Sequence, residues 1–238
     1  NIDTNVKEFA ILQDNLNEMI RRNEQVFSDQ KLFIENASHE LQTPLAIAIN
    51  KLDLLLDDTN LSEKQLVNLS ETKNSLWRMV NLNKSLLMLT RIENEQYSDK
   101  VEINFTQLIQ EILADFEPFF EAEEIKVELT ITADFIINFN KNLAHILISN
   151  LIRNAIKHNN DQKVIKILSE KNQLTFSNTS DFSALNSKVI FDRFYKQGQS
   201  EGSNGLGLSI IKTILKNQQS ITIDYQYKNS LHQFILKK

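Results

Sequence analysis

Cysteine is absent from this chain of 238 residues, which excludes disulfide frameworks, thiolate metal sites and cysteine nucleophiles. Histidine occurs four times at scattered positions, so a histidine-rich metal site is not expected. No apolar run approaches the roughly 20 residues that a membrane-spanning helix needs. Charged residues make up 24% of the chain with a net charge of −5 and no basic run, which argues against a nucleic-acid groove.

Glycine is also scarce, and all four glycines lie within ten residues: Gly198, Gly202, Gly205 and Gly207. The last two open an apolar helical pattern. Glycine allows positive φ and lets a ligand approach main-chain N–H groups, and a helix start adds the positive end of the helix dipole. The cluster therefore has two interpretations, a phosphate-binding site or a flexible surface loop before an ordinary helix.

The first part of the chain has helical periodicity. Apolar residues recur at spacings of three and four from Val6 to Leu56, and residues 57–60 have the composition of a turn. A second helix is predicted from Ser62 to about Leu89. Two helices alone cover such a long apolar stripe poorly, so we expect the hairpin to dimerise into a four-helix bundle.

After the polar stretch 95–100 the pattern changes to short strands alternating with helices. Strands are predicted at 101–105, 126–132, 135–139, 164–168, 173–177, 221–227 and 231–236, and helices at 106–122, 140–158 and 208–217. This mixture predicts an α/β sandwich with helices on one face of a mainly antiparallel sheet. The expected fold class is thus multidomain, α followed by α+β, with a helical hairpin at 1–97 and a second domain at 101–238.

A candidate chemical site lies on the first predicted helix. Ala37 and Leu41 belong to the apolar stripe, and His39 is two residues from each, so His39 should face water. Thr43 shares that face and Glu40 lies beside it. Histidine has a reference pKa of about 6.5, so a neutral imidazole is a competent nucleophile near neutral pH, and an adjacent carboxylate can accept its proton.

Pro44 lies one turn after His39, inside the predicted helix. Proline costs about 3 kcal/mol in a helix interior because it lacks an N–H and crowds the preceding turn. A kink or loosened turn beside His39 is therefore expected. With this proline, residues 33–45 (FIENASHELQTPL) resemble the H box of sensor histidine kinases of two-component systems, F-x-x-x-x-S-H-E-L-R-T-P-L, with Gln42 in place of the usual arginine. The resemblance implies that His39 is the phosphoacceptor, Glu40 the acid-base residue, and Thr43 a group that positions water when the partner's phosphate is hydrolysed.

A polar stripe marks the predicted helix 140–158, where Asn150, Asn154 and His158 recur every four residues with Lys157 beside them. Asparagine oxygens can bind Mg²⁺ and lysine can pair with phosphate, although asparagines at a core edge also cap loops. Residues 149–158 resemble the N box of the same kinases, N-L-x-x-N-A-x-K-Y. The resemblance places Mg²⁺ on Asn154 and Asn150 near the phosphates, with His158 where a tyrosine usually stacks near adenine.

Three further boxes of the family lie downstream. Residues 190–196 (IFDRFYK) resemble the F box, which includes Phe194, and residues 202–208 (GSNGLGL) resemble the G2 box. The resemblance implies that Gly205, Leu206, Gly207 and Leu208 bind ATP at the hinge of a nucleotide lid. The G1 box, D-x-G-x-G, departs from the pattern: residues 176–180 (FSNTS) place Asn178 where the adenine-reading aspartate is usual, and lack its glycines. Asp181 is a possible substitute.

The resemblance covers nearly the whole chain and implies a phosphotransfer hairpin followed by an ATP-binding domain of the Bergerat fold. The expected activity is ATP- and Mg²⁺-dependent phosphorylation of His39, followed by transfer to an aspartate of a response regulator. The expected partners are a second copy of the chain and that regulator, and the expected location is the cytoplasmic domain of an inner-membrane sensor. We expect the chain, which starts at Asn1, to be part of a longer protein.

Two alternatives stay open at this stage. One is a degenerate kinase that binds ATP weakly and acts as a docking module or as a phosphatase through Thr43, which the altered G1 box favours. The other is an ATPase of the gyrase or heat-shock chaperone type without a phosphohistidine, which the H box argues against.

Overall fold

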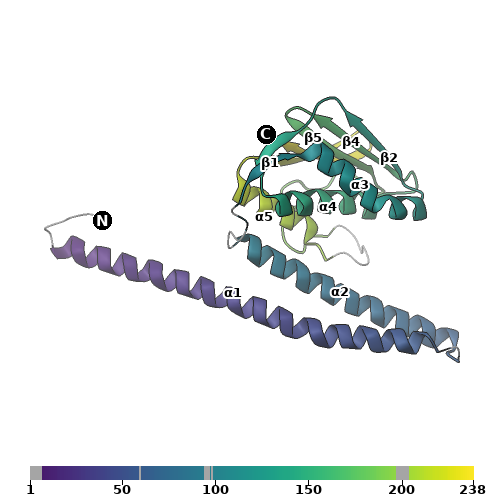
Figure 1. Cartoon of the computed structure of the whole chain (residues 1–238), viewed down its shortest axis with the longest axis horizontal. Coiled ribbons are helices and arrows are strands. Elements are labelled where there is room, and N and C mark those ends of the chain that lie inside the picture. Colours follow the sequence, from purple (N-terminus) through teal and green to yellow (C-terminus); the bar gives the residue numbers. More distant parts are fainter. Residues whose placement is uncertain (1–6, 59, 94–96, 98, 197–203) are drawn as a thin grey trace. The chain divides into compact units, whose positions relative to one another are not determined.

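The computed structural model describes residues 7–58, 60–93, 97, 99–196 and 204–238 of the chain. The chain divides into two compact units, Asn1–Thr90 and Arg91–Lys238, which are coloured along the sequence in Figure 1. Among the described residues, no helix combines the length and the apolar character needed to span a bilayer.

The first unit is a helical hairpin of α1 (Lys7–Leu56) and α2 (Glu63–Glu93) (Figure 1). The last three residues of α2 belong to the second unit. Both predicted helices are confirmed, and α1 continues as one helix through Pro44. The start of α2 is a capping box. The Ser62 backbone N–H donates to Gln65 Oε1 at 2.9 Å, and the Gln65 N–H donates back to Ser62 Oγ at 3.4 Å.

The hairpin packs around Leu45, Ile49 and Val80, with Leu76 against them. The seam thus differs from the predicted one, because Leu41 is 50% exposed whereas Ser38 is buried at 4%. The apolar residues of α1 cover a face wider than one partner helix, so α2 buries one edge of that face and leaves the other uncovered. Large apolar residues that stay exposed on α1 include Phe9, Leu12, Leu16, Met19, Val26, Phe27, Phe33, Leu41, Ile47 and Leu54.

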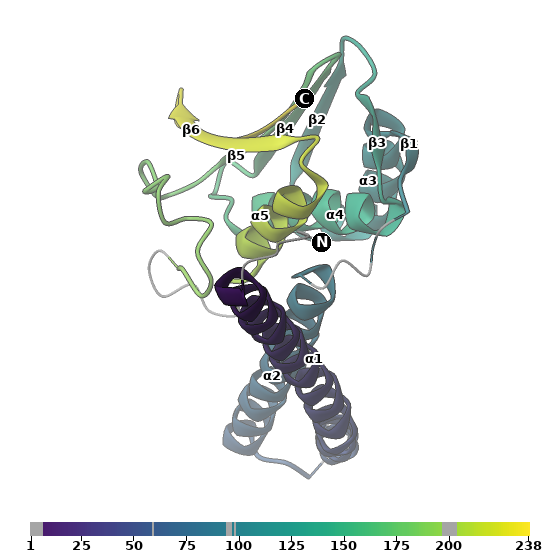
Figure 2. The same ribbon diagram turned by 90° about the vertical axis from the view of Figure 1, so that its left-hand side faces the viewer.

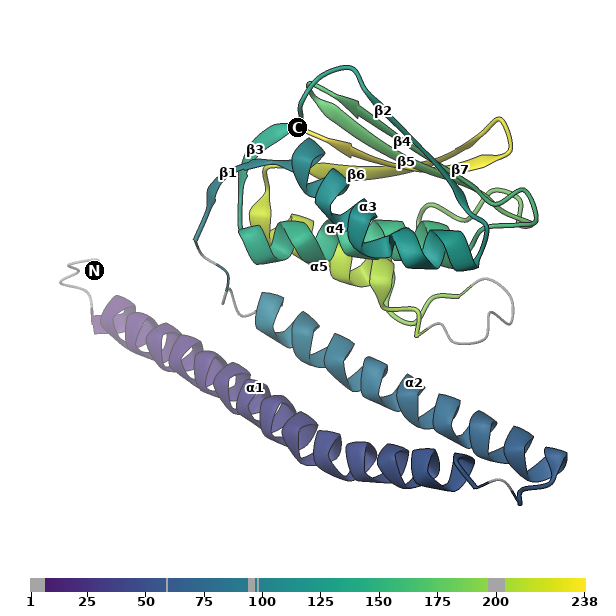
Figure 3. The ribbon, with the colours of Figure 1, turned by 45° about the vertical axis from the view of Figure 1, so that its right-hand side comes forward.

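The second unit contains every strand and helix predicted for it, with ends shifted by one or two residues. In order these are β1 (Val101–Asn104), α3 (Phe105–Ala122), β2 (Lys126–Ile131), β3 (Ile136–Phe139), α4 (Lys141–Lys157), β4 (Val164–Glu170), β5 (Gln173–Thr179), α5 (Gly207–Gln218), β6 (Thr222–Lys228) and β7 (Leu231–Lys237). Figures 2 and 3 show α3, α4 and α5 on one face of the large sheet, as the sequence pattern predicted.

The large sheet has five strands in the order β2-β4-β5-β7-β6. The β2–β4 pair is parallel, and the other pairs are antiparallel, with Phe176 of β5 opposite Phe234 of β7. Strands β1 and β3 form a separate antiparallel pair. Helix α4 fills the space beneath the sheet with Leu147, Ile148, Leu151 and Ile152, each at most 1% exposed.

Asparagine caps fix where α3 and α4 begin. Asn104 Oδ1 accepts from the backbone N–H groups of Thr106 and Gln107 at 3.0 and 3.2 Å, and Asn140 Oδ1 accepts from that of Leu143 at 3.1 Å. An N-cap of this kind satisfies amide donors that have no partner within the helix. The two caps therefore set the ends of the helices that carry the candidate nucleotide site and its support.

A hydrogen-bonded chain ties the segment after β5 to the sheet. The carbonyl of Phe182 can only accept, so His232 Nε2, 2.9 Å away, carries the proton. His232 Nδ1 then accepts from the Tyr225 hydroxyl at 2.8 Å, and the Tyr225 oxygen accepts from the Leu185 N–H at 2.9 Å. His232 is only 3% exposed, and burial raises the pKa of Tyr225.

Tyr225→Phe should therefore destabilise the second unit. The substitution leaves the Leu185 N–H and His232 Nδ1 without a partner, which should lower the free energy of unfolding by about 1–3 kcal/mol. Urea unfolding of the variant measures this. Tyr227→Phe is the matched control, because Tyr227 lies two residues along β6 and its hydroxyl makes no hydrogen bond within the described residues. Equal stability of the two variants would contradict a stabilising role for the hydrogen bonds of Tyr225.

Candidate functional sites

The candidate phosphoacceptor lies on the exposed side of α1. His39, Glu40 and Thr43 are all exposed, as predicted, whereas the preceding Ser38 is buried against α2. Burial of Ser38 and exposure of His39 follow from the 100° turn between consecutive helical residues. The imidazole is therefore open to a reaction partner, with a carboxylate as its chain neighbour.

The polar stripe of α4 lies between buried positions of the same helix. Asn150, Asn154 and His158 are half-buried and Lys157 is exposed. Asn150 Nδ2 donates to the Ile146 carbonyl at 2.8 Å, which leaves Asn150 Oδ1 directed elsewhere. Asn154 makes no side-chain hydrogen bond to any residue that the structure describes. Its oxygen is a hard donor of the kind that suits Mg²⁺.

The N-terminus of α5 lies next to this stripe. A Cβ placed on Gly207, the first residue of α5, would lie 3.4 Å from Asn150 Oδ1, so the G2 and N motifs meet in space. Among the described residues, no side chain caps this end of α5, so the N–H groups of the first turn of α5 can bind an anion. The Leu206 side chain is 1% exposed and belongs to the core, so only its backbone can face a ligand, while Leu208 is half-buried.

Gly205 lies where two segments of chain are in direct backbone contact. Its carbonyl accepts from the Phe194 N–H at 2.9 Å, and both residues have positive φ, +65° for Gly205 and +63° for Phe194. The Phe194 side chain is 56% exposed. The hydrogen bond between Phe194 and Gly205 thus joins the end of the F motif to the G2 motif. Gly198 and Gly202, which the sequence also singled out, lie outside the described residues.

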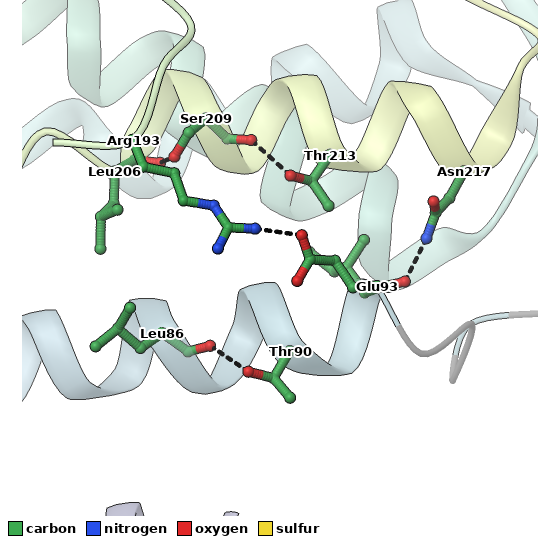
Figure 4. A network of polar contacts seen from close by, with 9 residues as sticks. Leu86, Thr90, Glu93, Arg193, Leu206, Ser209, Thr213 and Asn217 are labelled. Atoms are coloured by element: carbon green, nitrogen blue, oxygen red, sulfur yellow. Dashed lines mark hydrogen bonds and ion pairs between the residues drawn. The ribbon is translucent and has the colours of Figure 1, made fainter. Parts of the chain in front are cut away.

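Several polar contacts around α5 were not predicted from the sequence (Figure 4). Ser209 Oγ donates to the Leu206 carbonyl and Thr213 Oγ1 to the Ser209 carbonyl, both at 2.9 Å, which closes the first turns of α5. Arg193 forms an ion pair with Glu93, and Asn217 Nδ2 donates to the Ile92 carbonyl, both within the second unit. These contacts attach the end of α2 to the F motif and to α5.

Asn178 occupies the G1 position near the end of β5 and is 2% exposed. Its Nδ2 donates to the His158 carbonyl at 3.0 Å and to the Thr179 carbonyl at 2.8 Å. Because both partners can only accept, the amide orientation is determined and Oδ1 points away from them. No group among the described residues donates to Asn178 Oδ1, so this oxygen keeps its capacity to accept a hydrogen bond from a ligand. Asp181, the alternative, is exposed.

The comparisons with known families match both units in chain order. The family described as "His Kinase A (phospho-acceptor) domain" matches residues 29–95, and that described as "Histidine kinase-, DNA gyrase B-, and HSP90-like ATPase" matches residues 139–235. The chain belongs to the sensor histidine kinases. The resemblance of its motifs to that family is thereby confirmed, and the second family model is described as that of an ATPase.

The relatives of this kinase include sensor proteins from staphylococci. The chain is 34% identical to "Heme sensor protein HssS" of Staphylococcus epidermidis over 97% of its length, and 32% identical to the protein of that name from Staphylococcus aureus over 95%. These matches cover 51% and 50% of the relatives. The chain thus spans about half the length of the curated relatives it matches.

Solved structures of histidine kinases share its fold. The crystal structure of full-length ShkA in complex with AMPPNP aligns with 85% of this chain and 44% of its own at a TM-score of 0.63 and 16% identity. The Acinetobacter baumannii histidine kinase AdeS aligns with 84% of this chain and 96% of its own at a TM-score of 0.53 and 22% identity. These similarities establish the fold of the kinase.

Burial lowers the pKa of His158 from the usual 6.5, and the positive charge of the neighbouring Lys157 adds to the effect. The folded kinase should then bind fewer protons at this site than the unfolded chain does. This contribution to stability is complete above pH 6.5 and is lost as the pH falls from there through the folded-state pKa.

His158→Gln should therefore flatten the acid side of the stability profile. Urea unfolding at about pH 7.5 and about pH 5 gives the change in free energy for each protein. The wild type should lose more stability than the variant over this range. An equal loss in both would show that His158 does not titrate differently in the folded state.

Proposed function

We propose that this chain phosphorylates itself on His39 with ATP and passes the phosphoryl group to an aspartate of a response regulator. Residues 1–97 would act as the dimerisation and phosphotransfer domain and residues 101–238 as the catalytic domain. One observation carries the proposal. A single chain of this family combines an exposed histidine beside a carboxylate with a second unit in which no described side chain caps the N-terminus of α5, where phosphate could bind.

The chemistry at His39 is a phosphoryl transfer. The Nε2 lone pair attacks the γ-phosphorus, the bond to the bridging oxygen breaks, and ADP leaves with that electron pair. The proton on Nδ1 passes to Glu40, so the phosphorylated imidazole ends neutral. A regulator carboxylate then attacks the same phosphorus, the bond from phosphorus to Nε2 breaks, and Nδ1 takes the proton back from Glu40 so that a neutral imidazole leaves. Thr43, which shares the exposed side of α1, would position water when the regulator's phosphate is hydrolysed.

The residues around α4 and α5 fit ATP and Mg²⁺. Asn154 supplies an oxygen that has no hydrogen-bond partner among the described residues, Asn150 adjoins Gly207 at the start of α5, and Lys157 adds a positive charge. Mg²⁺ bound with the nucleotide would neutralise charge on the phosphate oxygens. The backbone of residues 205–208 would bind phosphate, and the exposed Phe194 would adjoin the nucleotide. His158 would lie near the adenine.

Asn178 should make the site select adenine over guanine. Its open Oδ1 can accept from the adenine amino group, whereas guanine has a carbonyl oxygen at that position and would leave two acceptors facing each other. ATP should therefore bind at least about tenfold more tightly than GTP. Calorimetric titration with each nucleotide measures the ratio, and Asp181→Ala, which alters the exposed alternative, should not change it. Equal affinities for ATP and GTP would contradict the assignment.

The proposed dimer forms through the hairpin. Apolar residues of α1 that α2 leaves uncovered include Ile47 and Leu54, which are two helical turns apart and so lie on one face of the helix. A second copy of the hairpin covers such a face in a four-helix bundle. Because the relatives are about twice as long, we further propose that the chain is the cytoplasmic part of a membrane-bound sensor protein.

The altered G1 motif supports a second candidate, a kinase-like scaffold or phosphatase that binds ATP weakly. One experiment separates the possibilities: the purified chain is incubated with radiolabelled ATP and Mg²⁺, and protein-bound and free phosphate are measured. The proposed function predicts protein-bound phosphate that is acid-labile and alkali-stable and that moves to an added receiver domain. Free phosphate without labelled protein would support the ATPase alternative, and absence of nucleotide binding would support the scaffold.

A further inference from the structure

The hairpin contains a buried amide directly beneath the phosphoacceptor turn. Asn83 of α2 is 8% exposed, and its Nδ2 donates to the backbone carbonyl of Ser38 at 2.9 Å. Ser38 is 4% exposed and immediately precedes His39. One turn earlier on α2, Val80 packs in the apolar cluster of the hairpin. A polar side chain thus replaces apolar packing at the layer that adjoins His39.

The bond joins a side chain of α2 to the backbone of α1. A carbonyl has two lone pairs, so Ser38 can accept from Asn83 as well as from the helix. If α1 slid or rotated against α2, the Asn83 donors would stay buried without this partner, which is unfavourable. Buried asparagines in coiled coils fix helix register in the same way. Asn83 therefore favours one rotational setting of α1 at this level.

That setting determines where the imidazole points. His39 follows Ser38 by one residue, so a fixed Ser38 carbonyl fixes the direction of the His39 side chain. The turn also needs support, because Pro44 cannot donate to the Glu40 carbonyl. We propose that Asn83 is a positioning residue for phosphoryl transfer, holding the His39 turn in the orientation in which it receives phosphate. The proposal rests on the proposed role of His39.

The test compares Asn83→Leu with the matched control Asn81→Leu in the full chain. Leucine has the same branched side-chain shape as asparagine and suits a buried layer, whereas Asn81 is exposed on the same helix. For each protein we would measure the rate of His39 labelling at saturating ATP, the KM for ATP, the melting temperature, and amide exchange across residues 38–44.

Asn83→Leu should lower the labelling rate about tenfold or more, while KM is unchanged and the melting temperature is unchanged or higher. Amide exchange across 38–44 should accelerate, and Asn81→Leu should match the wild type in rate and exchange. A wild-type labelling rate in Asn83→Leu, or a rate that falls together with the melting temperature, would overturn the proposal. Absence of His39 labelling in the wild type would instead contradict the proposed function. In that case, unchanged amide exchange in Asn83→Leu would still reject the role of Asn83 in holding the His39 turn.

Discussion

Gly205→Ala will reduce ATP binding and His39 labelling far more than Gly207→Ala. Alanine at 205 would place its Cβ 2.7 Å from the carbonyl carbon of Phe194 and 2.9 Å from the carbonyl oxygen of Tyr195. These are backbone atoms that cannot move aside as a flexible side chain can. The residue also has a φ of +65°, which costs an L-residue about 1–2 kcal/mol. The variant must therefore separate the two segments that the Phe194–Gly205 hydrogen bond joins.

The strain at φ alone corresponds to about a tenfold loss of affinity if binding requires the native backbone, and the steric contact adds to it. Gly207→Ala is the matched control, since its Cβ would meet only the side-chain oxygen of Asn150, at 3.4 Å. Alanine also favours the helix that starts there. Calorimetric titration with ATP should show a large loss for Gly205→Ala and a change within about threefold for Gly207→Ala. Similar affinities in the two variants would count against the joined segments as part of the nucleotide site.

Most secondary structure of this kinase could be predicted because the chain keeps strict local periods. The three-and-four spacing of α1 and the alternating strands of the second unit do not depend on distant partners. The position of the hairpin seam, in contrast, depends on packing against the second helix. Leu41 and Leu45 both belong to the apolar face of α1, and only packing against α2 decides that Leu45 is buried and Leu41 is not.

The candidate sites were predictable as motifs and not as geometry. The sequence places Asn178 at the G1 position, but its amide orientation comes from the His158 carbonyl, twenty residues away along the chain. The burial of Asn83 could not be predicted from the sequence, because an asparagine in a polar stretch of a helix usually faces solvent. The contact between Gly205 and Phe194 likewise requires two segments that only the folded chain brings together.

The most direct test of the account is the location of the phosphate that the chain takes from ATP. His39→Gln keeps a polar side chain at an exposed helical position and removes the nucleophilic nitrogen, so labelling should fall to background while the melting temperature is unchanged. His145→Gln is the matched control, since His145 is also exposed on a helix and should label like the wild type. Phosphate mapped to residue 39 by mass spectrometry, acid-labile and absent from His39→Gln alone, is the predicted result. Acid-stable label, or label that persists in His39→Gln, would contradict it.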